Sequence, residues 1–217
     1  MSADFFNITI SGLPGSGSTT LLRGLKEALQ FEGWKGFSGG EFMRAYAEEK
    51  GLFKVNAGMH HDSRHYEDDF DRKIDMGMRQ KLQSEKQWII ESWLSGFLAQ
   101  GVPGVLKVLM FCSDEAVKID RIVNRDSITP DVAKHNMRER YDANLSKWAR
   151  MYEKEWQDWV VNSGVMKADD QIDFWDPKLY DIVIDTYSQN QEAVLTTVLS
   201  ALKKKIEDGS RPITPGK

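Results

Sequence analysis

The chain has a single cysteine, Cys112, and no long run of apolar residues. One cysteine excludes an intramolecular disulfide, and its place at the end of the apolar stretch from Val108 predicts a small core residue in a reducing compartment. No stretch approaches the roughly 18 consecutive apolar residues that span a bilayer, and the N-terminus lacks the basic and apolar regions of a secretion signal. We therefore expect a soluble, cytoplasmic protein without a membrane segment.

The chain also lacks an excess of basic residues, internal repeats and low-complexity segments. Its formal net charge is −4, which argues against a general nucleic-acid binder. Its 217 residues, of which 41% are hydrophobic, are enough for one well-packed core and small insertions, so we expect one domain with mobile lobes. We expect a monomer, with a dimer left open.

Residues 8–20, ITISGLPGSGSTT, are the segment around which the chain is organised. A β-branched run is followed by a loop with Gly12, Gly15 and Gly17, and then by a helical pattern. In such a loop the glycines let backbone N–H groups turn inward, and the next helix presents its positive end to an anion. The spacing matches the phosphate-binding pattern G-x-x-x-x-G-K-[ST], except that Ser18 replaces the lysine. The sequence therefore predicts a phosphate site.

Short runs of residues typical of strands lie near residues 5–10, 88–90, 106–112 and 180–185, and a further strand near 34–37 would complete a sheet of five. The runs at 88–90 and 106–112 are continuously apolar, as central parallel strands are. Helical patterns alternate with the runs, which predicts an α/β fold with a doubly wound, five-stranded parallel sheet. Helices are expected at 19–29, from 41, from 70, at 114–124, at 131–161 and at 190–206.

Two features allow either a structural or a functional interpretation. Three histidines and Asp62, between residues 60 and 65, could hold a metal ion, but a polar loop explains them better because no cysteine joins them. The aromatic stripe from Tyr141 to Trp159 keeps a helical period. This period favours packing over a platform for stacking bases.

Several segments occur in a recognisable order: the loop at 12–20, SGGEFMR at 38–44, Glu91 at a strand end, three arginines after residue 120, and YDIVIDT at 180–186. This order resembles the cytidylate kinases of the nucleoside monophosphate kinase family, nearest their archaeal-type branch. The resemblance spans residues 6–206. It implies a P-loop NTPase fold and ATP-dependent, Mg²⁺-assisted phosphoryl transfer to a pyrimidine nucleoside monophosphate, CMP or dCMP.

The resemblance also implies a division of the chain and its donor site. Residues 1–37, 83–120 and 178–208 would form the core, 38–82 a monophosphate-binding insert, 121–177 a helical lid and 209–217 a flexible tail. Mg²⁺ would be held by Thr19 and Glu91, partly through water. The ATP phosphates would lie on Gly12, Gly15, Ser16, Gly17, Ser18, Thr19 and Thr20.

Positive charge and acceptor contacts are implied in the same way. Phosphoryl transfer needs positioning and positive charge more than covalent chemistry, and the lid arginines Arg121, Arg125 and Arg138 would be catalytic. Arg44 would clamp the acceptor phosphate, which a guanidinium can bind with two parallel hydrogen bonds. The full acceptor set implied is Ser38, Arg44, Asp71, Arg72 and Trp93.

Three positions depart from the family pattern. Ser18 removes the lysine that reaches the β- and γ-phosphates, although the archaeal-type branch commonly has a hydroxyl residue there and a lid arginine could supply the charge. Trp93 stands where the family has an arginine near the monophosphate. The arginine-tyrosine pair of the lid is either at 140–141 or replaced at 145–146. A kinase of another small molecule and a regulatory protein that binds nucleotide without efficient catalysis therefore stay open.

Overall fold

The strands of the sheet are β1 (Asn7–Gly12), β2 (Lys35–Ser38), β3 (Trp88–Glu91), β4 (Val105–Phe111) and β5 (Ile182–Asp185). The computed structural model describes residues 6–49 and 68–209. The strand order is β2-β3-β1-β4-β5, and every neighbouring pair is parallel. The predicted five-stranded parallel sheet is therefore confirmed, because each apolar run coincides with a strand to within a few residues.

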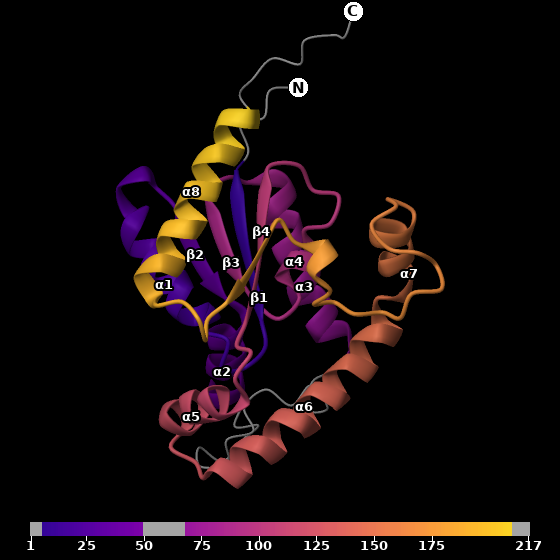
Figure 1. The fold of residues 1–217 in the computed structure, drawn as a ribbon. Coiled ribbons are helices and arrows are strands. Elements are labelled where there is room, and N and C mark those ends of the chain that lie inside the picture. Colours follow the sequence, from indigo (N-terminus) through magenta and orange to yellow (C-terminus); the bar gives the residue numbers. More distant parts are fainter. Residues whose placement is uncertain (1–5, 50–67, 210–217) are drawn as a thin grey trace, which may run out of the picture.

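Helices cover both faces of the sheet (Figure 1). On one face, α1 (Ser18–Ala28) packs against α8 (Gln191–Gly209), where Val194, Val198 and Leu202 are buried as their spacing predicts. On the other face lie α3 (Asp68–Ser84) and the short α4 (Ser95–Leu98). Beyond the carboxyl ends of the strands lie α2 (Gly39–Glu49), α5 (Glu115–Asp126) and α6 (Pro130–Met151).

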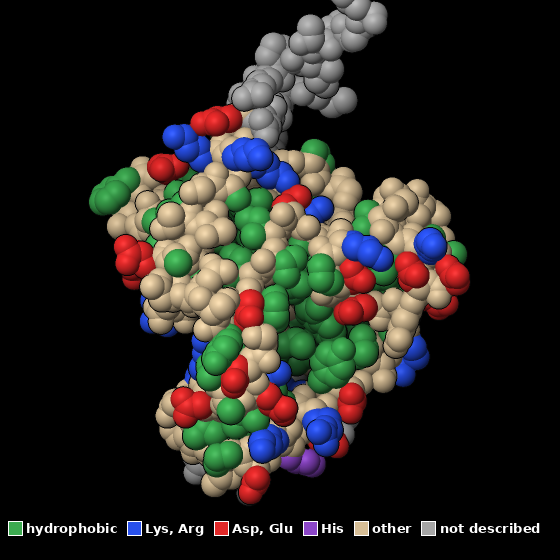
Figure 2. Space-filling model, in the orientation of Figure 1, with side chains coloured by type: hydrophobic (Ala, Val, Ile, Leu, Met, Phe, Trp, Pro, Cys, Tyr) green, Lys and Arg blue, Asp and Glu red, His purple; other side chains and the backbone are tan. Residues whose placement is uncertain are grey.

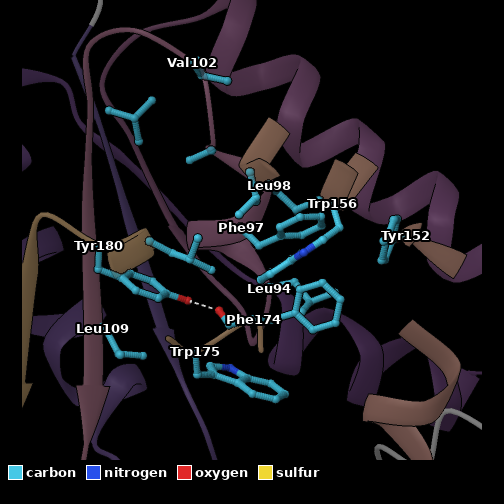
Figure 3. Packing of buried hydrophobic residues seen from close by; sticks show 14 of the residues in the cluster. Leu94, Phe97, Leu98, Val102, Leu109, Tyr152, Trp156, Phe174, Trp175 and Tyr180 are labelled. Carbon is cyan, nitrogen blue, oxygen red and sulfur yellow. Dashed lines mark hydrogen bonds between the residues drawn. The ribbon is translucent and has the colours of Figure 1, made fainter. Parts of the chain in front are cut away.

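An aromatic core fills the space beneath α4 (Figure 3). The ring of Phe97 is fully buried, with its centroid 4.8 Å from that of Phe174 and 6.1 Å from that of Trp156. The Tyr180 hydroxyl donates a hydrogen bond to the Phe174 carbonyl oxygen at 2.7 Å. The later part of the predicted aromatic stripe thus serves packing, as its helical period favours.

The single helix expected over 131–161 is wrong, because α6 ends at Met151. Tyr152 leaves the helical region with φ −114° and ψ 19°, and the chain continues as α7 (Glu153–Trp156) and a π-helical turn (Gln157–Val161). The Tyr152 side chain is fully buried, and its hydroxyl donates to Asp75 Oδ2 at 2.6 Å. The break therefore brings Tyr152 inward toward both the aromatic core and α3.

Other predictions meet the structure only in part. Cys112 is buried, as predicted, whereas the three histidines and Asp62 lie outside the described residues. In the described ranges, no helix is long and apolar enough to cross a membrane. Within those same ranges, no three His, Cys, Asp or Glu side chains are grouped to hold a metal ion. The division into core, insert, lid and tail stays a prediction.

Candidate active site

The phosphate loop lies between β1 and α1, and its glycines are required by its shape. Gly15 and Gly17 have φ values of 83° and 87°, in the left-handed region that favours glycine. A Cβ at Gly12 would lie 2.3 Å from Ser16 Oγ and 2.9 Å from the Met110 carbonyl oxygen. The helix α1 starts directly after Gly17 without a side-chain cap, so its positive end is open to an anion.

Glu91, at the end of β3, joins the phosphate loop to the start of α2. Its Oε1 accepts a hydrogen bond from Ser18 Oγ and its Oε2 accepts one from Ser38 Oγ, both at 2.7 Å. Ser38 Oγ also accepts from the backbone N–H of Glu41 at 3.2 Å, within the first turn of α2. All three residues of the Ser18-Glu91-Ser38 bridge are buried, with exposures of 7%, 6% and 6%. The serine at the lysine position thus binds a buried carboxylate.

A cavity of about 840 Å³ begins at the phosphate loop and continues to both sides of it. We call one side the donor section, which is lined by α1, α5 and residues 186–195. The other side, the acceptor section, is lined by α2, α3, the end of β3 and α6. Figure 2 shows hydrophobic side chains gathered between the body of the molecule and the lobe formed by α5 and the start of α6. A volume of this size is typical of sites for small molecules.

The three predicted lid arginines occupy different surroundings. Arg121 and Arg125 line the cavity, whereas Arg138 is exposed and lines a separate cavity of about 480 Å³ between α5 and α6. Arg121 donates to the Gly15 carbonyl oxygen at 3.0 Å. Arg125 donates from Nε and Nη2 to both carboxylate oxygens of Asp126, each at 2.7 Å. Arg121 thus bonds to the phosphate loop and Arg125 lines the same cavity, whereas Arg138 shares the second cavity with Leu13 and Pro14 of the loop.

In the acceptor section, Arg140 lies against Trp93. The Arg140 guanidinium carbon is 5.3 Å from the Trp93 ring centroid, and Arg140 is only 6% exposed. The Trp93 ring meets that of Trp148 edge-on, with centroids 5.6 Å apart. All three side chains line the cavity. A guanidinium from α6 is therefore held by a cation–π contact with Trp93, two residues after the end of β3.

Three polar pairs connect α3 to the end of α6 and to α7. Lys147 Nζ donates to Asp71 Oδ2 at 2.8 Å, and both side chains are nearly buried. Asp75 accepts from the Tyr152 hydroxyl, and burial raises the pKa of the Asp75 carboxyl to about 7. The third pair, Arg72 with Glu155, completes what we call the α3–α6 brace. Asp71 and Asp75 line the cavity, but Arg72 does not.

The remaining predicted residues are placed as follows. Thr19 and Thr20 line the cavity at the start of α1, and Ser16, within the loop, is buried. Arg44 belongs to α2, but its side chain lies outside what the structure describes. Of the acceptor set, Trp93 and Asp71 thus meet at one cavity.

Comparisons with known proteins identify relatives of this chain. The family described as AAA domain matches residues 8–144. The cytidylate kinase of Haloarcula marismortui is 30% identical over 210 residues, covering 96% of this chain and 95% of that protein. The cytidylate kinase of Methanosarcina barkeri is 31% identical over 196 residues, covering 90% and 95%. The chain belongs to the cytidylate kinase family.

A solved structure supports the fold alone. The gluconokinase from Sinorhizobium meliloti 1021 superposes with a TM-score of 0.51 at 13% identity, covering 94% of each chain. Together with the phosphate loop and the strand order, this likeness confirms the predicted P-loop NTPase fold of this cytidylate kinase relative. The resemblance inferred from the order of the sequence motifs is likewise confirmed.

Several cavity residues of this cytidylate kinase relative were not in the predicted site. They share a helical spacing that could have revealed them, because residues four apart lie on one face of a helix. On α6, Arg140, Asn144 and Trp148 are four apart and all line the cavity. On α3, Asp71 and Asp75 are four apart and both line the cavity, whereas Arg72, next to Asp71 in the sequence, does not.

Proposed function

We propose that this protein catalyses ATP-dependent phosphoryl transfer to a pyrimidine nucleoside monophosphate, with CMP and dCMP as the preferred acceptors. The observation that carries the proposal is one continuous cavity that joins the phosphate loop to an acceptor section with tryptophan rings, carboxylates and a buried guanidinium. Flat aromatic faces suit a nucleobase, and Asp71 and Asp75 suit the hydrogen-bond donors of a base or sugar. Membership of the cytidylate kinase family supports the choice of acceptor.

The chemistry asks the protein for positioning and for positive charge along the transferring phosphoryl group. We propose that the N–H groups of the loop and the start of α1 bind the ATP phosphates. Gly17 and the first residues of α1 line the cavity, and no side chain caps this end of the helix. Arg125 approaches from α5 and Arg140 from α6, so that the two guanidiniums lie on the donor and acceptor sides. These arginines would supply the charge that Ser18 does not carry.

The residues present also fit Mg²⁺. This ion prefers oxygen ligands and commonly binds through one or two protein groups together with substrate phosphates. Thr19 offers a hydroxyl at the cavity wall, and Glu91 offers a buried carboxylate that accepts hydrogen bonds from two serines. The two residues would hold the ion partly through water. When bound, Mg²⁺ would neutralise phosphate charge. The task of the chain's own residues would be to hold the ion and orient the phosphates.

The test is ADP formation with the purified protein, ATP and a panel of nucleoside monophosphates, extended to small alcohols outside the nucleotides. We expect the highest turnover with CMP and dCMP. Turnover only with a non-nucleotide would identify a kinase of another small molecule. Calorimetric binding of ATP without turnover for any acceptor would identify a regulatory nucleotide-binding protein, and both results would contradict the proposal.

Two matched variants test the part assigned to Arg140. Arg140→Met keeps the length of the side chain but removes the charge, and we expect kcat with CMP to fall by about 100-fold, as when one donor to a transition state is lost. Arg150→Met makes the same change on the exposed face of α6 and should leave kcat unchanged. Equal activity of the two variants would exclude a role of Arg140 in transfer.

A further inference from the structure

Thr186, the residue directly after β5, holds the phosphate loop from behind. It is 7% exposed, and its Oγ1 lies 3.0 Å from the Ser16 carbonyl oxygen and 3.1 Å from that of Phe111. Its backbone N–H donates to the same Phe111 oxygen at 2.9 Å. One side chain thus joins the phosphate loop to the ends of β4 and β5.

Arg121 completes this arrangement from α5. Its Nη1 donates to the Gly15 carbonyl oxygen at 3.0 Å and to Thr186 Oγ1 at 2.8 Å, while Nη2 donates to the Thr186 carbonyl oxygen at 2.9 Å. A guanidinium can make these three bonds together because its donors lie in one rigid plane. We call Arg121 and Thr186, with their bonds to Gly15 and Ser16, the loop strap.

The loop strap fixes how the loop presents its donors. In a trans peptide the C=O and the following N–H point in opposite directions. Thr186 Oγ1 donates a hydrogen bond to the carbonyl oxygen of Ser16. The N–H of Gly17 belongs to the same peptide group, and it is therefore directed away from Thr186. The loop also has no lysine to bind its ligand directly, so the orientation of the backbone carries more of the phosphate binding.

We infer that Thr186 and Arg121 are positioning residues for the phosphate loop, and that Arg121 acts on phosphate through the loop backbone and not as a lid group that closes over it. The inference rests on the proposed function, because it concerns how the loop binds ATP. Residues 186–195 also line the donor section. The loop strap therefore connects the wall of the donor section to the phosphate cradle.

The first test is calorimetric binding of ATP and of adenosine to the full chain. Thr186→Val keeps the shape of the side chain and removes the hydroxyl, and we expect ATP binding to weaken about tenfold, as for a lost buried hydrogen bond, with little change for adenosine. Thr186→Ser restores the hydroxyl and should bind ATP within twofold of the wild type. Thr197→Val, at an exposed threonine of α8, is the matched control and should change nothing.

The second test separates positioning from general destabilisation. Thr186→Val should raise the KM for ATP while leaving the KM for the acceptor within twofold, and Arg121→Lys should do the same because an ammonium cannot bridge the three acceptors. The double variant, with both Thr186→Val and Arg121→Lys, should bind ATP about as tightly as whichever single variant has the lower affinity, because both residues act through one hydrogen-bond network. If Thr186→Val fails to fold, the two single variants Arg121→Lys and Thr186→Ser test the positioning role without it.

Two results would overturn the inference. One is ATP binding by Thr186→Val that equals the wild type. The other is an equal rise of both KM values together with failure of Thr186→Ser to restore binding. ATP binding can be measured even if no acceptor is phosphorylated, so failure of the loop strap and failure of the proposed transfer reaction are distinguishable.

Discussion

At the scale of single residues, Ser18 is the position where the sequence pattern and the site differ most. A lysine there would carry charge to the phosphates, whereas the serine donates a hydrogen bond to Glu91 inside the protein. The spacing of the glycines was enough to predict the loop. The partner of Ser18 could not be predicted, because Glu91 is 73 residues away and reaches it only through the pairing of β3 with β1.

The Ser18-Glu91-Ser38 bridge leads to a prediction at Glu91. Glu91→Gln keeps the size of the side chain but removes its charge, and we expect kcat to fall about 10- to 100-fold and the Mg²⁺ concentration for half-maximal rate to rise, because groups that orient a metal or its waters have effects of this size. Steady-state rates over a Mg²⁺ titration measure both. Glu32→Gln, at an exposed site, is the control. An unchanged Mg²⁺ dependence in Glu91→Gln would contradict the metal role.

The predicted site residues also show what a linear pattern can and cannot identify. Asp71 and Trp93 reach the cavity as expected, but Arg72 pairs with Glu155 away from it. Neighbouring residues on a helix point about 100° apart, so adjacent side chains can have different surroundings, as Asp71 and Arg72 do. Which of the two faces the cavity depends on how α3 packs against α6.

At the scale of elements, α6 is the helix whose length was predicted wrongly. The apolar stripe continues to Trp159, and its members pack against the aromatic core on both sides of the break: Tyr141, Leu145, Trp148 and Trp159 partly buried, and Tyr152 fully buried. The break itself arises from tertiary contacts, in which Tyr152 binds Asp75 across 77 positions of sequence. The other strands were easier to predict than β2, because they are short runs rich in apolar residues and bounded by turn residues.

The α3–α6 brace leads to a prediction about stability and pH. The pKa of Asp75 is about 7 in the folded protein, above its ordinary value near 3.9. Between about pH 4 and pH 7 the folded state therefore keeps a proton on Asp75 that the unfolded state has already released. The Asp75 contribution to the free energy of unfolding therefore decreases as the pH rises through this window. Above pH 7 it stays low.

Asp75→Asn removes this titration and can still accept the hydrogen bond from Tyr152. Thermal melts between pH 5 and pH 8 should show a smaller loss of melting temperature for Asp75→Asn than for the wild type. Asp169→Asn, at an exposed position, should behave like the wild type. The brace assignment would be wrong if Asp75→Asn and Asp169→Asn had the same pH profile.

At the scale of the whole molecule, the parallel sheet explains why the site lies where it does. The phosphate loop and Thr186 follow β1 and β5, and Glu91 is the last residue of β3, so all three lie at the edge of the sheet where the strands end. The helices α3 and α6 then add the acceptor section next to this edge. The sequence allowed the sheet and its phosphate loop to be predicted, but the acceptor section depends on contacts between elements far apart in the chain.

The central claim is phosphoryl transfer from ATP to a pyrimidine monophosphate, and phosphorus NMR of the purified protein with equimolar ATP, CMP and Mg²⁺ tests it most directly. Transfer predicts that the CMP signal and the ATP γ-phosphate signal decrease together, while CDP and ADP signals increase in equal amounts. Release of inorganic phosphate with ADP while CMP stays unchanged, or no change in any signal, would contradict the account.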